Sequence, residues 1–378
     1  MSYTEVESVG WFGRIGNSIK GIVIGIVLVA VGGGLLWWNE GRSVNRAKDL
    51  EEGIEAVIYL DSIDKVESGM EGRLVHATGL ASGGKVLRDP IFAVEARALA
   101  LHRVVEMYQW IEKKTTREEK KIGGGVDKVT QYDYELDWRD EAVDSSKFKV
   151  PEGHGNETMR VKSLATKAPK VEFGAFTLPD FLVSKIKGRE EIPPSGQAIE
   201  AAGKYHNSPR LEGGHIYLGD SPDNPVAGDM RISFSIVPEA VVSIIAAQKG
   251  ETFAPYSTSR KGQLSLLSMG EAASEEMFEQ AKADNVALTW GLRLGGFILA
   301  LIGFNLVLGP LSVLADVIPL IGSIVGGATF VVSLFLSAGI SSLVIALAWV
   351  AYRPWVGIPL LVVTLGSFVA LFFVRKKK

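Results

Sequence analysis

The last quarter of the chain, residues 290–374, constrains its fold most, because it contains almost no charge. Between Arg293 and Arg353 the single charged residue is Asp316, and residues 355–374 carry none. The hydrocarbon core of a bilayer is about 30 Å thick and takes about 20 apolar residues of helix, with every backbone polar group paired inside the segment. This tract is long enough for about three crossings, so we expect a membrane protein.

A further apolar run lies near the N-terminus, at residues 15–38. Its only charge is Lys20, close to the end of the run, from where an ammonium group reaches water. A cleaved signal peptide would have a shorter apolar core that ends in small residues. We therefore predict a retained first transmembrane helix within residues 1–40, preceded by an interfacial lead-in. The run ends in a membrane-exit motif formed by Trp37, Trp38, Asn39, Glu40, Gly41 and Arg42.

The middle of the chain, residues 41–284, is hydrated, and its apolar residues mostly alternate with polar ones. This period of two is typical of strands that have one buried face. The clearest element is a predicted hairpin of residues 101–111 and 130–138, joined by a charged and mobile loop at 113–128. We therefore expect a large α+β, mainly antiparallel-β extramembrane domain.

The C-terminal part, residues 285–378, is predicted to hold the remaining transmembrane helices and a basic C-terminus. A second span at 286–308 should end at Pro310, because proline lacks the N–H that a helix needs. An interrupted segment at 310–321 follows, which is re-entrant or interfacial. A third and a fourth span then complete four transmembrane α-helices, one N-terminal and three C-terminal, at residues 322–352 and 355–374.

The orientation is predicted from the basic residues that flank the spans. Four crossings place both termini on one side, and the basic C-terminus favours the cytoplasm for that side, although several cations near the other ends of the spans oppose it. Charges in long loops count for less, so the large domain is expected outside the cytoplasm.

Polar and small residues within the apolar segments are the candidate functional positions. An ionisable group at membrane depth is costly unless it is paired, which makes Asp316 and Asn305 candidates for a site, with a capping or loop role for Asp316 as the alternative. Small residues at steps of four allow helices to approach closely. These helix-packing candidates are Gly21, Gly25, Gly322, Gly326, Ser333, Ser337 and Ser341.

The hydrated part carries no catalytic signature. The chain has no cysteine, which excludes thiol catalysis, disulfides and Cys-ligated metals. His206 and His215 could meet across a turn, but ordinary turn histidines are the favoured interpretation, so neither a metal nor a cofactor is predicted. The alternating carboxylates of the hairpin are interpreted as a solvated face rather than as acid–base pairs. They are Glu106, Glu112, Asp133, Glu135 and Asp137.

Several strings of this sequence resemble one family of membrane proteins. They are the exit motif at 36–42, the string Arg-Val-Val-Glu-Met-Tyr-Gln-Trp at 103–110, and Gly-Asp-Met-Arg at 228–231. Together with the arrangement of one plus three spans, they resemble the transmembrane protein 43 (LUMA) family over essentially the whole chain. The resemblance implies a four-span protein that in eukaryotes resides in the endoplasmic reticulum and inner nuclear membrane and binds lamins and emerin. This sequence looks like a prokaryotic relative, for which we expect the cytoplasmic membrane and do not carry lamin binding over.

Three functions are consistent with this pattern. The favoured one is a non-enzymatic membrane scaffold that tethers or assembles membrane protein complexes through its extramembrane domain. The alternative is a transporter or channel subunit that uses a helix break between Asn305 and Pro319, and a weaker alternative is a membrane-bound hydrolase. The expected partners are membrane lipids, other proteins and a second copy of the chain. Nucleic acid is not expected, because the net charge is −3.

Overall fold

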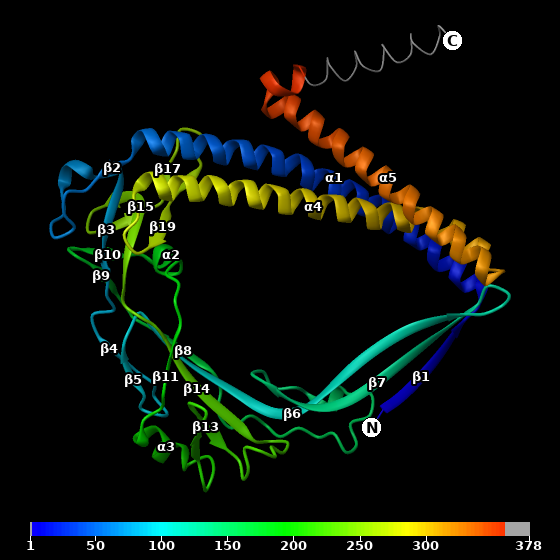
Figure 1. Cartoon of the computed structure of the whole chain (residues 1–378), viewed down its shortest axis with the longest axis horizontal. Coiled ribbons are helices and arrows are strands. Elements are labelled where there is room, and N and C mark those ends of the chain that lie inside the picture. Colours follow the sequence, from blue (N-terminus) through cyan, green and yellow to red (C-terminus); the bar gives the residue numbers. More distant parts are fainter. Residues whose placement is uncertain (1, 360–378) are drawn as a thin grey trace. The chain divides into compact units, whose positions relative to one another are not determined.

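The computed structural model describes residues 2–359 (Figure 1). The chain divides into two compact units, each assembled from separate stretches of sequence. The sheet unit comprises Glu52–Thr115 and Gln131–Glu279 with the first residues of the chain. The helix unit comprises Glu5–Glu51, Thr116–Thr130 and the residues from Gln280 onward. Of residues 41–284, predicted to form one domain, the sheet unit holds 52–115 and 131–279, and the remainder belongs to the helix unit.

Three helices are long and apolar enough to cross a membrane in the part of the chain that the structure describes. They are α1 (Trp11–Ala56), α4 (Ser274–Ala315) and α5 (Pro319–Tyr352). Only 17% of the residues in each of their most apolar windows are buried, as expected of helices that face lipid. Residues 354–359 are helical, but the rest of the predicted fourth span lies outside the described residues.

The larger sheet is built around the predicted hairpin, and neighbours in its central path are hydrogen-bonded in the order β1-β7-β6-β14-β13-β12. Two further strands pair at its sides, β8 with β6 and β11 with β14. The members are β1 (Ser2–Val9), β6 (Ala100–Lys120), β7 (Val126–Arg139), β8 (Leu164–Lys167), β11 (Glu190–Ile192), β12 (Arg210–Glu212), β13 (His215–Leu218) and β14 (Met230–Val237).

The smaller sheet has the order β2-β3-β15-β16-β10-β9, with β19 paired to β15. Its longest pairing is antiparallel, between β3 and β15, and places Ile244 opposite Ala77. The members are β2 (Ile58–Tyr59), β3 (Leu74–Ala81), β9 (Val171–Phe173), β10 (Phe176–Leu178), β15 (Ala240–Lys249), β16 (Thr252–Ala254) and β19 (Leu266–Met269). Short pairs complete the unit: β4 (Val86–Arg88) with β5 (Glu95–Arg97), and β17 (Tyr256–Ser257) with β18 (Gln263–Leu264).

Each sheet contributes to its own apolar core. Alternate residues of β6 and β14, among them Val105 and Ile232, are buried with residues of α3 (Gly196–Ala202). A second core joins β3, β9, β10 and β15 to Leu182 of α2 (Asp180–Val183). A buried ion pair closes the first core, because Nη1 of Arg103 donates to both carboxylate oxygens of Asp89 at 2.8 and 2.7 Å. The mainly antiparallel α+β prediction is therefore confirmed for this unit.

Two local predictions around the hairpin differ from the structure. Residues 2–9, part of the predicted interfacial lead-in, form strand β1, because the free edge of β7 provides backbone partners. The loop predicted at 113–128 is mostly strand, and only residues 121–125 turn. Gly123 and Gly124 make this turn with φ of 91° and 81°, a region that glycine occupies without steric cost.

The helix ends also differ from the prediction. Helix α1 continues well past the exit motif to Ala56, so it does not end where the chain leaves the apolar run. Helix α4 continues through Pro310 to Ala315, and the interruption before α5 is limited to residues 316–318. The proline does not end the helix, since the helix tolerates one missing hydrogen bond where its neighbours pack.

Candidate functional site

Asp316, the one charge in the apolar C-terminal tract, lies in the turn between α4 and α5 and is fully paired there. Its side chain is only 2% exposed and accepts from Arg14 Nη2 at 2.5 Å and from Lys120 Nζ at 2.6 Å. Burial alone would raise the pKa of this carboxyl, but the hydrogen bonds from Lys120 and Arg14 outweigh it, so the pKa lies below its ordinary value. Asp316 is therefore a charged anchor at neutral pH.

The same anchor holds the turn of the β6–β7 hairpin through its backbone. The N–H of Gly123 donates to the carbonyl of Val317 at 3.1 Å, and Arg14 Nη1 donates to the carbonyl of Gly124 at 2.6 Å. Trp11 Nε1 donates to the carbonyl of Val313, near the end of α4, at 2.9 Å. We call Trp11, Arg14, Lys120, Gly124 and Asp316 the tip cluster. It joins α1, the hairpin and the α4–α5 turn within the helix unit.

A second polar cluster lies at the exit motif and is centred on Glu40. This carboxylate is 1% exposed and accepts from Arg293 Nε and Nη2 at 2.7 and 2.9 Å and from Trp349 Nε1 at 2.8 Å. The guanidinium of Arg293 also lies 4.8 Å from the ring centre of Trp290. The Glu40 cluster thus connects α1, α4 and α5 by charge-assisted hydrogen bonds, which are stronger than neutral ones.

The remaining polar residues of the exit motif bind α4 as well. Arg42 Nη1 donates to Asn285 Oδ1 at 2.9 Å, and its Nη2 donates to Thr289 Oγ1 at 3.0 Å. Asn39 Nδ2 donates to the carbonyl of Thr289 at 3.0 Å. Trp37 and Trp38 are exposed, whereas a Cβ at Gly41 would overlap the ring of Tyr352.

Several small residues lie where two helices approach closely. A Cβ at Gly25 would meet the carbonyl of Gly303 and the side chain of Val307, and a Cβ at Gly32 would meet the carbonyl of Gly296 at 2.8 Å. Helices α1 and α4 lie side by side and run antiparallel (Figure 1). The contacts show this, because residue numbers that increase along α1, from Gly25 to Gly32, meet numbers that decrease along α4, from Gly303 to Gly296. Gly21 lies at ordinary contact distance from Leu306.

The other packing candidates belong to α5. Gly322 leaves room for the carboxylate of Asp316, which a Cβ there would overlap, whereas Gly326 has only an ordinary contact. The hydroxyls of Ser333 and Ser337 donate to backbone carbonyls of their own helix one turn earlier. Ser341 is buried, and its hydroxyl has no hydrogen-bond partner among the described residues.

Asn305 occupies regular helix rather than a break. Its side-chain amide donates to the carbonyl of Leu301 at 3.2 Å, in the preceding turn of α4. The helix break predicted to begin at this residue is therefore wrong, and Asn305 and Asp316 do not lie in one unwound segment.

The carboxylates of the hairpin do not converge on one point. Glu106 pairs with Arg231, Glu112 accepts from the hydroxyl of Tyr134 at 2.7 Å, and Glu135 pairs with Lys113. Asp137 pairs with Arg139 at 2.9 Å, and Asp133 accepts from Gln131 at 2.9 Å. His206 lies 3.7 Å from Asp220. Among the described residues there is no group of three or more His, Asp or Glu side chains that could hold a metal ion.

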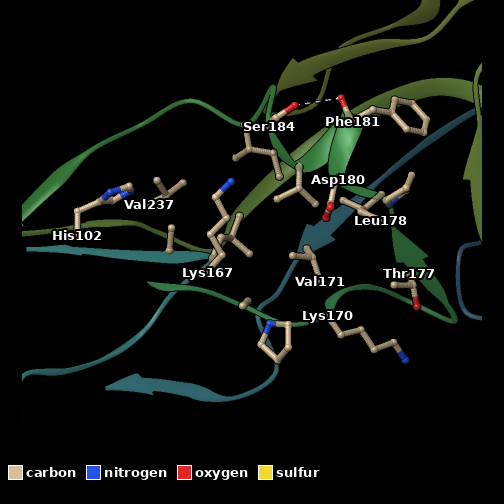
Figure 2. A pocket seen from close by; sticks show the side chains of 17 residues that line it. His102, Lys167, Lys170, Val171, Thr177, Leu178, Asp180, Phe181, Ser184 and Val237 are labelled. Atoms are coloured by element: carbon tan, nitrogen blue, oxygen red, sulfur yellow. Dashed lines mark hydrogen bonds between the residues drawn. The ribbon is translucent and has the colours of Figure 1, made fainter. Parts of the chain in front are cut away.

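Sequence reasoning missed a cavity of about 890 Å³ in the sheet unit. It lies where the first residues of β6 and the end of β14 meet β8, β10 and α2, so residues distant in the sequence line it (Figure 2). Its lining includes His102, Lys167, Lys170 and Asp180 among apolar side chains. Burial, with the nearby charges of Arg189 and Lys167, lowers the pKa of His102. No local pattern could have revealed this cavity, because side chains from strands far apart in the sequence and from α2 pack together to form it.

Long apolar helices joined at buried charge clusters, together with a large antiparallel β domain, define this chain as a multi-pass membrane protein. It belongs to the transmembrane protein 43 family, whose model, described as "Transmembrane protein 43", matches residues 107–354.

Curated relatives with that name extend the match over most of the chain. The chain is 33% identical to transmembrane protein 43 of Homo sapiens over 356 residues, which cover 91% of this chain and 88% of the relative. The Rattus norvegicus protein is 34% identical with the same coverage, and the Drosophila melanogaster homolog is 29% identical over 92% of this chain and 93% of its own. No solved structure matches.

Proposed function

We propose that this protein is a non-enzymatic scaffold of its membrane, which tethers or assembles membrane protein complexes through the sheet unit. The observation that carries the proposal is the internal pairing of the buried charges in the helix unit. Glu40 and Asp316 are each neutralised by side chains from other segments of the same unit. Charges that are paired in this way hold segments of the protein together and are not free to bind a transported solute.

The transporter alternative requires polar groups that are free to line a path. Asn305 is bonded to its own helix, and Asp316 is held by two cations. The hydrolase alternative requires a convergent nucleophile or acid–base pair, and the hairpin carboxylates are instead distributed over separate ion pairs and hydrogen bonds. The scaffold is therefore the function that the geometry supports best.

The test combines native extraction with cross-linking. The full chain is extracted in polymer nanodiscs and cross-linked through its lysines, and the linked peptides are identified by mass spectrometry. The scaffold predicts reproducible links from lysines of the sheet unit to the same membrane proteins or to a second copy of the chain. Lysines in both units are available, so links from the tip residue Lys120 serve as an internal comparison.

A flux measurement supplies the opposing outcome. The purified chain is reconstituted in liposomes and compared with its Asp316→Asn variant. A solute or ion flux above that of empty liposomes, abolished in a variant that still inserts, would replace the scaffold by a transporter. A chain that forms no reproducible links from the sheet unit would also contradict the proposal.

A further inference from the structure

The cavity of the sheet unit has the size and the walls of a small-molecule site. Its volume of about 890 Å³ lies within the range of about 300–1,000 Å³ that is usual for ligand pockets. One part of the wall is apolar and is formed by side chains from both sheets and from the α2 region. These are Leu99, Val171, Leu178, Val183, Ile186 and Val237. An apolar wall of this kind favours an occupant with a hydrocarbon part.

Another part of the wall carries basic side chains. Lys167 and His102 project from the same face of the larger sheet, because Lys167 pairs with Ala100 and His102 lies two residues further along β6. Arg189 lies close enough to influence His102 and donates its Nε–H to Ser235 Oγ at 2.6 Å. Ser235 is paired directly with His102 across the strands. His102 and Lys167 therefore line the cavity from one face of the sheet, with Arg189 near His102 but outside the lining.

These basic groups have little negative charge to balance them. Among the described residues, the side chains of Lys167 and His102 form no ion pair or hydrogen bond, and the one acid that lines the cavity is Asp180. Figure 2 shows the Lys167 side chain directed into the space between the strands and α2, whereas Lys170 extends away from it. The Lys167 ammonium and a ring N–H of His102 can both donate hydrogen bonds to an anion.

We propose that this cavity binds an anionic lipid with a single acyl chain. The acyl chain would lie along the apolar wall at Leu178 and Val183, and the carboxylate or phosphate head group would be bound by Lys167 and His102. A small inorganic anion would leave the apolar wall hydrated, and a neutral lipid would leave the Lys167 ammonium unpaired. The bilayer that holds the helices is the source of such amphiphiles. This site is independent of the scaffold role.

The experiment uses the full chain in nanodiscs of zwitterionic phosphatidylcholine. The probe is palmitate that carries a photoreactive diazirine and an alkyne, and labelled peptides are quantified by mass spectrometry. Labelling is expected on peptides of residues 165–186, with competition by unlabelled palmitate or by palmitoyl lysophosphatidate. The stronger competitor identifies the head group. Monopalmitoyl glycerol, which has the same chain without a charge, is expected to compete about tenfold less well.

Two variants and one control separate the charge from the apolar wall. Lys167→Glu should raise the palmitate concentration needed for half-maximal labelling about tenfold or more. Val183→Trp should abolish labelling by filling the cavity. Lys204→Glu, the same change at an exposed lysine outside the lining, should bind as the parent does. Each variant is first shown to unfold at the temperature of the parent.

The proposal is overturned by any of three results. Equal competition by monopalmitoyl glycerol and palmitate removes the anionic head group. Labelling that is unchanged in the folded Lys167→Glu and Val183→Trp variants removes the cavity. Labelled peptides confined to the transmembrane helices show an ordinary membrane background instead of a site.

Discussion

At the scale of single residues, the strings that carry the family resemblance mostly form partnered polar contacts. Glu40 binds Arg293, Arg103 binds Asp89, and Glu106 binds Arg231 through two hydrogen bonds at 2.6 and 2.9 Å. Breaking a buried ion pair lowers stability strongly, because the remaining partner keeps its charge without water or a counter-ion. Breaking an exposed ion pair changes stability little. These pairs therefore contribute to stability and, at Glu40, to the placement of the helices.

The pair of Arg103 and Asp89 gives the sharpest stability prediction. Arg103→Met should lower the free energy of unfolding of the sheet unit by about 3–5 kcal/mol, since it strands the Asp89 carboxylate in the core. The measurement is denaturant unfolding of the full chain in nanodiscs, followed by tryptophan fluorescence. Arg97→Met is the matched control, because Arg97 is 66% exposed in its pair with Glu239 and should cost less than about 1 kcal/mol. Equal losses in the two variants would contradict the prediction.

Tyr217 and Asp229 give a prediction about alkaline pH. Burial and the 2.6 Å hydrogen bond that its hydroxyl donates to Asp229 raise the pKa of Tyr217 above its ordinary value. A raised pKa means that the unfolded state loses this proton first, so stability falls as the pH rises above about 10. Tyr217→Phe should be less stable at pH 8 by about 1–3 kcal/mol, because Asp229 loses a donor.

The same variant should lose stability less steeply between pH 10 and 12 than the parent, by up to about 1.4 kcal/mol per pH unit. Unfolding of the full chain at a series of pH values measures both effects. A parallel decline of parent and variant would mean that other groups cause the alkaline loss.

At the scale of elements, the β6–β7 hairpin is anchored at its turn. The turn is bonded to Val317 through Gly123 and to Arg14 through Gly124, and Lys120 reaches Asp316. An exposed charged loop would be mobile, as the sequence suggested, but these bonds hold its backbone. The end of the hairpin, residues 116–130, is therefore bound within the helix unit.

Asp316→Asn should release this turn. The amide keeps its shape but loses the charge that two cations bind, so the turn should be cut faster by trypsin after Lys120 and Lys121. The rate of cleavage in nanodiscs, read by mass spectrometry, measures this release. Glu119→Gln removes one negative charge from an exposed pair with Arg117 in the same strand and should leave the rate unchanged.

Acid should have the same effect as that substitution. Because the pKa of Asp316 is lowered in the folded chain, the anchor contributes stability above the ordinary aspartate pKa of about 4 and loses it as the pH falls through the lowered value. An acid-stable protease that cuts the parent hairpin equally at pH 5 and pH 2.5, while the sheet unit stays folded, would contradict this.

The pairing of α1 with α4 depends on glycine at the closest contact. Gly25→Leu should lower the unfolding temperature of the helix unit and promote aggregation, because a side chain there would overlap the carbonyl of Gly303. Gly34→Leu is the control, since a Cβ at Gly34 has nothing within 4 Å. Light scattering during heating in nanodiscs measures the temperature at which each of the two variants aggregates. An equal shift in both variants would indicate a general effect of the larger side chain.

At the scale of the whole molecule, neither unit is a continuous stretch of sequence. The ends of α1 and α4 beyond the apolar runs belong to the sheet unit, where Phe278 is 1% exposed and a Cβ at Gly53 would overlap Leu264 and Phe278. The hydroxyl of Tyr59 also lies 2.7 Å from that of Ser274, at the start of α4. The boundary between the two units therefore lies inside the continuous helices α1 and α4.

This continuity predicts how fragments should behave. A fragment of residues 52–279 should unfold cooperatively, whereas one of residues 57–272 should be less stable by about 3–5 kcal/mol, the usual cost of removing a buried phenylalanine. Urea unfolding followed by circular dichroism compares them. Fragments of equal stability would show that the helix ends do not contribute to the core.

The sequence predicted those parts of the fold that depend on local pattern. The two strands predicted at residues 101–111 and 130–138 lie within β6 and β7. Helix ends were less accurate, since α4 passes Pro310 and α1 passes the exit motif. The polar candidates were located, but the cations bound to Asp316 were not, because nothing near it in the sequence identifies them.

The sequence by itself determined that this chain has long apolar helices and a hydrated β-rich domain. Hydropathy and the alternation of apolar and polar residues are local properties, and they decide which segments favour lipid and which favour water. Only the tertiary structure decided which charges neutralise one another and where the cavity lies. Arg14 and Lys120 reach Asp316 from 302 and 196 residues away. Pairing over such distances depends on how strands and helices pack, and no local pattern encodes it.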